Sequence, residues 1–202
     1  MQNLLDLPKP YDIKNDDIKD VCGSKWLTLK ETTYKDKNGN DQKWQFVARS
    51  KNEAATGVVA RTEKSGKFLF IVNGRVPMNK WVIGFPGGLV KPGEDIVAAA
   101  NRELKDETGY KCKRVLTMNP PSPKSAGLTT EQGSGIGCIV DDKAAGKTEL
   151  ESTEKITHFW ATAKQFFEIM EKVNPETTVA SSGTWSYMSG YLDARGRRKK
   201  KE

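Results

Sequence analysis

The stretch from Phe85 to Tyr110 reads FPGGLVKPGEDIVAAANRELKDETGY, a glycine loop followed by a charged segment with helical periodicity. Apolar residues recur in it at spacings of three and four, which favours a helix with one buried stripe. That stripe holds Val97, Ala100 and Leu104. Gly109 is expected to end the helix, because glycine readily adopts the left-handed conformation that follows a last helical turn. The helix should therefore dock on a core.

Three acids, Glu103, Asp106 and Glu107, share a second face of this helix, which we expect to point away from the core. At about 100° per residue they lie within roughly a quarter of a turn. A solvated helix face is the ordinary explanation of such charges. Here, however, the helix dipole and the repulsion between Glu103 and Glu107 both oppose them. The pattern therefore predicts a metal site for Mg²⁺, with Mn²⁺ as the alternative ion.

The spacing of these residues resembles the Nudix box, G-x5-E-x7-R-E-U-x-E-E-x-G-U, in which U is a bulky apolar residue. Asp106 stands where the box has the first glutamate of its closing pair. The resemblance implies a Nudix hydrolase with an α/β/α sandwich around a mixed sheet. The matching residues are Gly88, Glu94, Arg102, Glu103, Leu104, Asp106, Glu107, Gly109 and Tyr110.

Alternating and β-branched runs predict the strands of the remaining chain. Two of them, within residues 25–34 and 41–50, flank Asn38-Gly39, a strong signal for a two-residue hairpin turn. Strands interleaved with helices predict the α/β class, with helices on both sides of a mixed sheet. Further strands are expected at 56–61, 67–72, 81–85, 113–117, 136–141 and 156–162, and helices at 163–173 and 183–194.

Composition and charge divide the chain into four parts. We expect an extended N-terminal arm at 1–23, a β-hairpin subdomain at 24–55, a Nudix domain at 56–194 and a disordered basic tail at 195–202. Of the net charge of +7, the tail RGRRKKKE contributes +5 and residues 1–194 only +2. This distribution argues against a nucleic-acid-binding domain. The tail is either a solvated end or a segment that binds anionic partners or directs localisation.

The sequence has no apolar run of 18 residues and no charged-then-apolar leader. We therefore expect neither a membrane span nor a signal peptide. The cysteines, Cys22, Cys112 and Cys138, are scattered and form no C-x-x-C pair. This usage predicts a reducing, cytoplasmic location without disulfides or a zinc site, and the basic tail leaves a nuclear location open.

The chain also resembles one branch of the Nudix family, the ADP-sugar or ADP-ribose pyrophosphatases, over about residues 24–192. The hairpin sequence, the GRVPM segment at 74–78 and the loop ending in AGLTTE carry this resemblance. It implies hydrolysis of ADP-ribose or another ADP-sugar to AMP and a sugar phosphate. In this branch hairpin tryptophans stack on adenine and nearby arginines hold the substrate. By position these residues are Trp26, Trp44, Arg49 and Arg75.

A hairpin turning at Asn38-Gly39 would place Trp44 opposite Thr33 and Trp26 opposite Lys51. The two indoles would then lie roughly 23 Å apart, at about 3.3 Å per residue, and on opposite faces. One hairpin could not sandwich a base between them, and a cross-strand aromatic pair is excluded as well. Two protomers that exchange hairpins could sandwich a base, each supplying one tryptophan, and the branch that the chain resembles forms such homodimers.

The resemblance implies that Glu103 and Glu107 are the main Mg²⁺ ligands, with Asp106 and the carbonyl of Gly87 added. The bound ion would neutralise the phosphates and activate a water. Arg102, next to the acids, would orient Glu94 and Glu103 rather than touch the substrate.

A glutamate in a loop outside the box often activates the attacking water in this branch, and residues 141–155 form the matching loop. Glu154, immediately before a predicted strand, is our first choice, Glu151 the second and Glu149 the third. The alternative is that all three are solvated loop charges.

Other functions stay open on sequence alone. The substrate could be a dinucleoside polyphosphate, a GDP-sugar or capped RNA. A catalytically weak nucleotide sensor would keep the tryptophans but would not need every acid of the box. An RNA-binding protein would depend on the basic tail at 195–202.

Overall fold

The computed structural model describes residues 10–51 and 54–199. The chain forms two compact units. One, the hairpin unit, comprises Met1–Ala54 and Pro121–Gly133, and the other, the box unit, comprises Ala55–Pro120 and Ser134–Glu202. Segment 121–133 therefore belongs to the hairpin unit, whereas we expected it within the Nudix domain at 56–194.

The box unit is built on a mixed sheet in the order β11-β6-β5-β4-β9-β7, with β10 also paired to β5. β11 runs parallel to β6, and β10 runs antiparallel to β5. The short 3₁₀ helix η3 (Val76–Met78) joins β5 to β6. The strands are β4 (Ala55–Thr62), β5 (Phe68–Arg75), β6 (Lys80–Gly84), β7 (Cys112–Met118), β9 (Gln132–Val140), β10 (Ile156–Ala161) and β11 (Thr178–Ala180).

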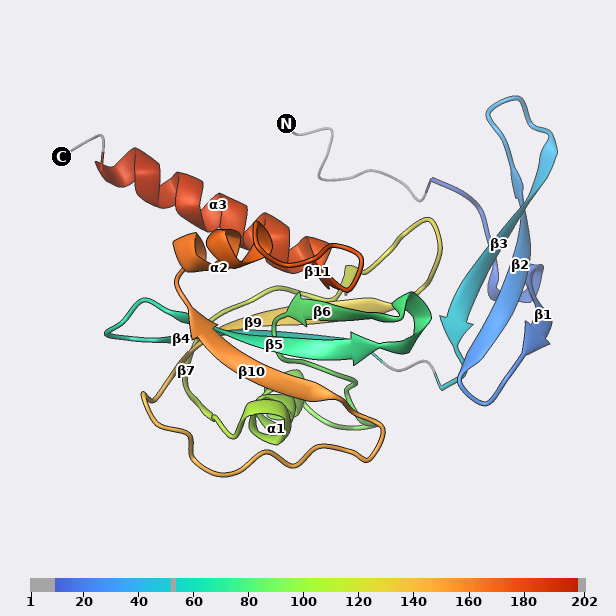
Figure 1. The fold of residues 1–202 in the computed structure, drawn as a ribbon. Helices are drawn as coiled ribbons and strands as arrows, with labels where there is room; N and C mark the ends of the chain where they lie inside the picture. Colours follow the sequence, from blue (N-terminus) through green and yellow to red (C-terminus); the bar gives the residue numbers. More distant parts are fainter. Residues whose placement is uncertain (1–9, 52–53, 200–202) are drawn as a thin grey trace. The chain divides into compact units, whose positions relative to one another are not determined.

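Helices cover both faces of this sheet. α1 (Ile96–Thr108) lies on one face, and α2 (Ala163–Met170) and α3 (Ser182–Lys199) lie on the other (Figure 1). Alternate residues of β5 divide between two cores, as strand geometry requires. Leu69 packs with the α1 side, whereas Phe68 and Phe70 pack with the α2 and α3 side. The prediction of an α/β fold with a mixed sheet between helices is confirmed.

Helix α1 is capped at both ends, and it ends at Gly109 as its sequence predicts. The Asp95 side chain caps it, accepting hydrogen bonds from the N–H groups of Val97 and Ala98 at 2.9 and 3.0 Å. Gly109 ends it with φ 76°, and its N–H donates to the Lys105 carbonyl at 2.7 Å. Leu104 is fully buried. Because the helix is fixed by two caps and one buried stripe, its acids have defined positions.

The hairpin unit contains a second sheet, in the order β1-β2-β3. Its elements are η2 (Asn15–Asp17), β1 (Ile18–Gly23), β2 (Leu27–Lys35) and β3 (Asp41–Arg49). β8 (Ser122–Pro123) pairs with Gly133 and Gln132 at the start of β9. Both hairpin strands agree with the predicted ranges.

The hairpin turns over Asp36–Asn40 rather than through a two-residue turn. The Asp36 carboxylate accepts hydrogen bonds from the N–H groups of Asn38 and Asn40, both at 2.9 Å. Gly39, with φ 84°, closes this longer loop. Trp44 consequently faces Thr32. The predicted register, with Trp44 opposite Thr33, is wrong by one residue because the aspartate side chain stabilises a longer turn.

The corrected register moves the two tryptophans relative to each other. Thr32, opposite Trp44, is an even number of residues from Trp26, and strand alternation then predicts one shared face instead of opposite faces. Trp26 directly precedes β2 and still accepts a hydrogen bond from Ser50 N–H at 3.0 Å. The separation along the ladder remains roughly 20 Å at about 3.3 Å per residue, which is too wide for both indoles to enclose one base.

Two expected segment boundaries differ from the structure. Residues 18–23 of the expected arm form β1, although they lack an alternating apolar pattern, because backbone pairing with β2 stabilises them. Residues 195–199 of the expected disordered tail continue α3, since arginine and lysine are good helix formers and suit a helix C-terminus. Residues 1–9 and 200–202 lie outside the described residues. Within the described ranges, no helix is long and apolar enough to cross a membrane.

Candidate active site

A glycine loop after β6 lies between β4 and the acidic residues of α1. The carbonyls of Pro86 and Gly88 accept hydrogen bonds from Val58 and Thr56 of β4, both at 2.8 Å. Gly87 N–H donates to Glu107 Oε2 at 2.8 Å. A Cβ at Gly87 would lie 2.2 Å from the Thr56 carbonyl oxygen. Only glycine fits this close approach.

Gly88 is also closely packed, in its case against a side chain of α1. A Cβ there would lie 2.6 Å from the Glu103 carboxylate. The two glycines thus let the loop approach the strand and the acids at once. This packing explains why the sequence needs a glycine pair before the helix.

Glu107 is buried, with 3% of its surface exposed, so the expectation that the acidic face points away from the core is wrong for this residue. The glycine loop covers it. Burial raises the pKa of Glu107 from 4.5 to about 8; the Gly87 hydrogen bond lowers it, and the charges of Glu103 and Glu154 raise it further. A carboxyl in this setting favours either a proton or a cation.

Arg102 joins two other acids of the motif, Glu94 and Glu103, into one network. Its Nε and Nη2 donate to both oxygens of Glu94, at 2.9 and 2.8 Å, and its Nη1 donates to Glu103 Oε1 at 2.7 Å. Nη2 also donates to the Leu89 carbonyl at 3.0 Å. These bonds hold the pKa of Glu94 at about 2. The guanidinium therefore fixes Glu94 and Glu103 and ties both to the glycine loop.

Glu103 and Asp106 complete the helix acids. Partial burial raises the pKa of Glu103 above its usual value, and although Arg102 opposes this shift, the charges of Glu154 and Asp106 add to it. Asp106 is half-buried. Its carbonyl accepts a hydrogen bond from the Glu149 N–H at 2.8 Å. The helix acids and Glu154 thus act on one another through space.

The three glutamates of the 141–155 loop have different surroundings. Glu154 is half-buried, and its charge acts on both Glu103 and Glu107. Glu151 is exposed, and its N–H donates to Glu154 Oε2 at 2.9 Å. Glu149 forms an ion pair with Lys105 of α1 at 2.5 Å. The structure therefore brings Glu154 to the helix acids and engages Glu149 elsewhere.

Arg75 ends β5 with an exposed side chain, and its positive charge lowers the pKa of Glu107. The remaining predicted substrate residues lie in the hairpin unit. Trp26 is 62% exposed, with Lys25 Nζ 4.7 Å from its ring centroid, and Trp44 is 49% exposed. Both indoles thus offer large accessible surfaces.

Arg49 and Trp44 hold the 121–133 segment within the hairpin unit. Arg49 Nε donates to Glu131 Oε2 at 2.9 Å, and Trp44 Nε1 donates to the Gly127 carbonyl at 3.3 Å. Sequence reasoning missed Glu131 as the partner of Arg49. Equally, it missed Lys105 as the partner of Glu149. Neither pair is separated by a helical or strand period, so no local signal could have found them.

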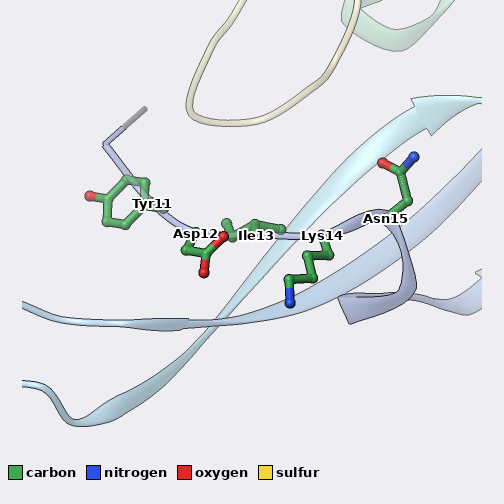
Figure 2. Close-up of a pocket in the computed structure, with 5 residues that line it drawn as sticks. All are labelled: Tyr11, Asp12, Ile13, Lys14 and Asn15. Atoms are coloured by element: carbon green, nitrogen blue, oxygen red, sulfur yellow. The ribbon is translucent and has the colours of Figure 1, made fainter. Parts of the chain in front are cut away.

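Figure 2 shows a surface hollow along the segment before β1, lined by Tyr11, Asp12, Ile13, Lys14 and Asn15. It contains one carboxylate and none of the predicted site residues. The Tyr11 ring packs edge-on against Tyr34, at 5.1 Å between centroids. This hollow does not mark the acidic site.

The acidic site offers oxygen donors in excess of nearby positive charge. Arg102 is shared between Glu94 and Glu103, which leaves Glu107, Asp106 and Glu154 without a guanidinium partner among the residues described. Oxygen-rich, negatively charged sites suit hard divalent cations. Across residues 10–51 and 54–199, no three acids, histidines or cysteines converge on a point that could hold an ion. The carboxylate donors of Glu103, Asp106 and Glu107 nevertheless have the chemistry that such a cation requires.

Comparison with known proteins gives consistent matches. The profile of the NUDIX domain matches residues 51–179. ADP-ribose pyrophosphatase of Saccharomyces cerevisiae is 28% identical over 190 residues, covering 88% of this chain and 82% of that protein. ADP-sugar pyrophosphatase of Mus musculus is 33% identical over 112 residues, covering 50% of this chain and 51% of that protein.

A solved structure, described as the crystal structure of ADP compounds hydrolase, has the same fold. It aligns with a TM-score of 0.71 and 19% identity, covering 95% of this chain and 99% of that one.

Proposed function

Because this chain belongs to the Nudix family, we propose that it hydrolyses the pyrophosphate bond of a nucleoside diphosphate sugar. ADP-ribose or another ADP-sugar is the substrate that the similarity to the yeast and mouse enzymes favours. The products are AMP and a sugar phosphate. The observation that carries the proposal is the site at α1, where Glu107 is buried under the glycine loop and the charge of Glu154 acts on Glu103 and Glu107.

We infer that the metal ion is Mg²⁺, with Mn²⁺ as a substitute. Glu103, Glu107 and Asp106 would hold it, and the carbonyl of Gly87, a residue whose N–H donates to Glu107, would be a further ligand. When bound, such an ion neutralises phosphate oxygens and lowers the pKa of a coordinated water. Burial, and after it the charges of neighbouring acids, raise the pKa values of Glu103 and Glu107, and this supports the assignment because a bound cation would offset both effects.

The protein residues supply position and proton transfer. Arg102 holds Glu103 and Glu94 through charge-assisted hydrogen bonds, so that Glu103 would keep its orientation when its carboxylate binds a metal ion. Glu154 is the proposed base that takes a proton from the attacking water. Its half-buried position beside the helix acids supports this role over Glu151, which is exposed, and over Glu149, which is paired with Lys105.

Substrate binding is proposed for the two exposed tryptophans and for two arginines. Trp26 and Trp44 would stack on adenine, and Arg75 would bind phosphate, as its charge reaches Glu107. Arg49 donates its Nε to Glu131, and within residues 10–51 and 54–199 its Nη groups have no hydrogen-bond partner, so they are proposed to bind the substrate. Because one hairpin spans too far to enclose a base, we propose a homodimer whose hairpins, residues 24–55, are exchanged.

The cysteine pattern supports a reducing compartment, and we propose the cytoplasm, with the nucleus as the alternative. Among the described residues, Cys22 is exposed, Cys112 partly buried and Cys138 buried, each with a free thiol. No disulfide is needed for either core.

A substrate panel tests the function. ADP-ribose, ADP-glucose, a GDP-sugar, a dinucleoside polyphosphate and capped RNA are each incubated with the protein and Mg²⁺, and mononucleotide release is measured by chromatography. We expect AMP from the ADP-sugars at the highest kcat/KM. Faster hydrolysis of the dinucleoside polyphosphate or of capped RNA would replace the ADP-sugar assignment, and no hydrolysis of any compound would favour a nucleotide sensor.

A further inference from the structure

The loop that carries Glu154 is fastened to the C-terminal end of α1. Figure 1 shows the loop between β9 and β10 passing beside this helix. The N–H groups of Ala145 and Gly146 donate to the Gly109 carbonyl at 2.8 and 3.1 Å, and Glu149 N–H donates to the Asp106 carbonyl at 2.8 Å. The last carbonyls of a helix lack partners within it. Residues 145–149, which we name the strap, satisfy two carbonyls at this end.

Close packing supports the strap at its first contact. A Cβ at Gly109 would lie 2.3 Å from the Gly146 carbonyl oxygen. Gly109 therefore has two functions, ending the helix in the left-handed conformation and admitting the strap. A bulkier residue would force the loop away from the helix.

One ion pair joins the side chains of the strap and the helix. Lys105 Nζ lies 2.5 Å from Glu149 Oε1. The Asp106 charge also acts on Lys105, and the Lys111 charge on Glu149, so the pair lies among both signs of charge. Lys105 directly precedes Asp106 and Glu107 in sequence. The ion pair thus connects the strap to the helical turn that carries two of the acids.

The far end of the loop is also fixed. Glu154 N–H donates to the Glu151 carbonyl at 3.0 Å, and Glu151 N–H returns a bond to Glu154 Oε2 at 2.9 Å. The Lys155 carbonyl accepts from Gly74 N–H at 2.9 Å, and Ile156 then pairs with Asn73. The stretch between Glu149 and Lys155 is therefore short and held at both ends.

We propose that Lys105 and Glu149 are positioning residues: their ion pair fastens the strap to α1 and thereby holds Glu154 near Glu103 and Glu107. This role rests on the proposed function, because it assigns proton transfer to Glu154. Lys105 occupies the unspecified position of the box, where the motif itself requires no residue type. The Lys105–Glu149 ion pair determines the position of Glu154 and does not contact the substrate.

The expected effect is on turnover rather than on binding. An exposed ion pair makes only a small contribution, so its loss should lower kcat by about two- to fivefold. The KM and the Mg²⁺ dependence should change less than about twofold, because the metal ligands and the tryptophans stay in place.

Four variants separate positioning from simple electrostatics. Lys105→Met removes a positive charge near the acids, whereas Glu149→Gln removes a negative one, so a purely electrostatic influence would change kcat in opposite directions. If both residues act by fastening the strap to α1, kcat should decrease by the same factor in both variants. The double variant should be no slower than either single variant, because the second change removes no further interaction. Lys105→Arg should keep the wild-type kcat, because arginine can form the same ion pair with Glu149.

A matched control comes from the start of the same loop. Lys113 and Asp141 form an exposed ion pair at 3.1 Å that does not involve α1. Lys113→Met should leave kcat unchanged. An equal loss of kcat in this variant would show that any surface ion pair has the same effect and would overturn the positioning role.

Hydrogen exchange tests the strap without any turnover. The amides of Ala145, Gly146 and Glu149 should exchange more slowly in the wild type than in Lys105→Met or Glu149→Gln. Unchanged exchange, or faster exchange with unchanged kcat, would overturn the proposal. If the wild type hydrolyses no nucleotide sugar, the proposed function fails and so does the positioning role, whereas protection of these amides would still establish the strap.

Discussion

Replacing Glu107 with glutamine should stabilise the metal-free protein at neutral and alkaline pH, even though it removes a proposed metal ligand. Glu107 is 3% exposed, and an amide oxygen can still accept the hydrogen bond from Gly87 N–H. The shape of the side chain is kept. The substitution removes only the ability to ionise, which would place a buried negative charge near those of Glu103 and Glu154.

The magnitude follows from the pKa of Glu107, which burial raises from 4.5 to about 8. Between these two values the folded protein keeps a proton that the unfolded chain has released, so the free energy of unfolding falls as the pH rises. At about 1.36 kcal/mol per pH unit, the whole interval corresponds to about 5 kcal/mol. We expect Glu107→Gln to exceed the wild type by about 3 to 5 kcal/mol above this window and to equal it below.

Urea unfolding at a series of pH values from 5 to about 8.5, in the presence of a chelator, measures this difference. Glu168→Gln is the control, since Glu168 is an exposed residue of α2 that faces Lys164. Its stability should follow that of the wild type at every pH. Equal stability of Glu107→Gln and the wild type at the highest pH would refute the reasoning, because it would mean that the buried carboxylate carries no penalty. Adding Mg²⁺ should stabilise only the proteins that retain Glu107.

Three further predictions concern activity. Glu103→Gln should remove most activity at saturating Mg²⁺ while circular dichroism shows an intact fold; near-normal turnover would contradict the metal assignment. Glu154→Gln should lower kcat by about 10²- to 10⁴-fold with little change in Mg²⁺ or substrate affinity, whereas a loss under about tenfold would move the base to Glu151 or Glu103. Trp26→Ala and Trp44→Ala should each raise KM, as stacking contributes about 1 to 3 kcal/mol per base, and mixing the two variants should restore some tight sites. A monomer by light scattering at micromolar concentration would count against the exchanged dimer.

The region from Phe85 to Gly109 could be predicted from sequence because its signals are local. The buried Leu104 and the left-handed Gly109 each follow from residue type and spacing. The burial of Glu107 could not be predicted in this way. It depends on the glycine loop, which approaches the helix only because β4 holds Pro86 and Gly88.

The hairpin shows how one side chain can change a prediction. Asn38-Gly39 signals a tight turn, but the Asp36 carboxylate bonds two later N–H groups and closes a longer loop. The register then shifts by one residue. The sequence contained this aspartate, but its competition with the tighter turn is an energetic balance that pattern matching does not resolve.

Elements without a pattern of their own were missed. β1 has largely exposed residues, and β11 (Thr178–Ala180) is too short for alternation to be visible. The strap is of the same kind, since its bonds to the Asp106 and Gly109 carbonyls use backbone groups that any residue has. Backbone hydrogen bonds of this kind depend on how the folded chain brings distant segments together, so only the folded structure reveals them.

The most direct test of the proposed function is product analysis with ADP-ribose alone. Purified protein is incubated with ADP-ribose and Mg²⁺, and AMP and ribose phosphate are both quantified, with parallel samples containing excess chelator or the Glu103→Gln variant. The proposed function predicts equal amounts of the two products, formed only by the wild type with metal. Intact ADP-ribose in that sample, or equal AMP formation by the variant, would contradict hydrolysis at the α1 site.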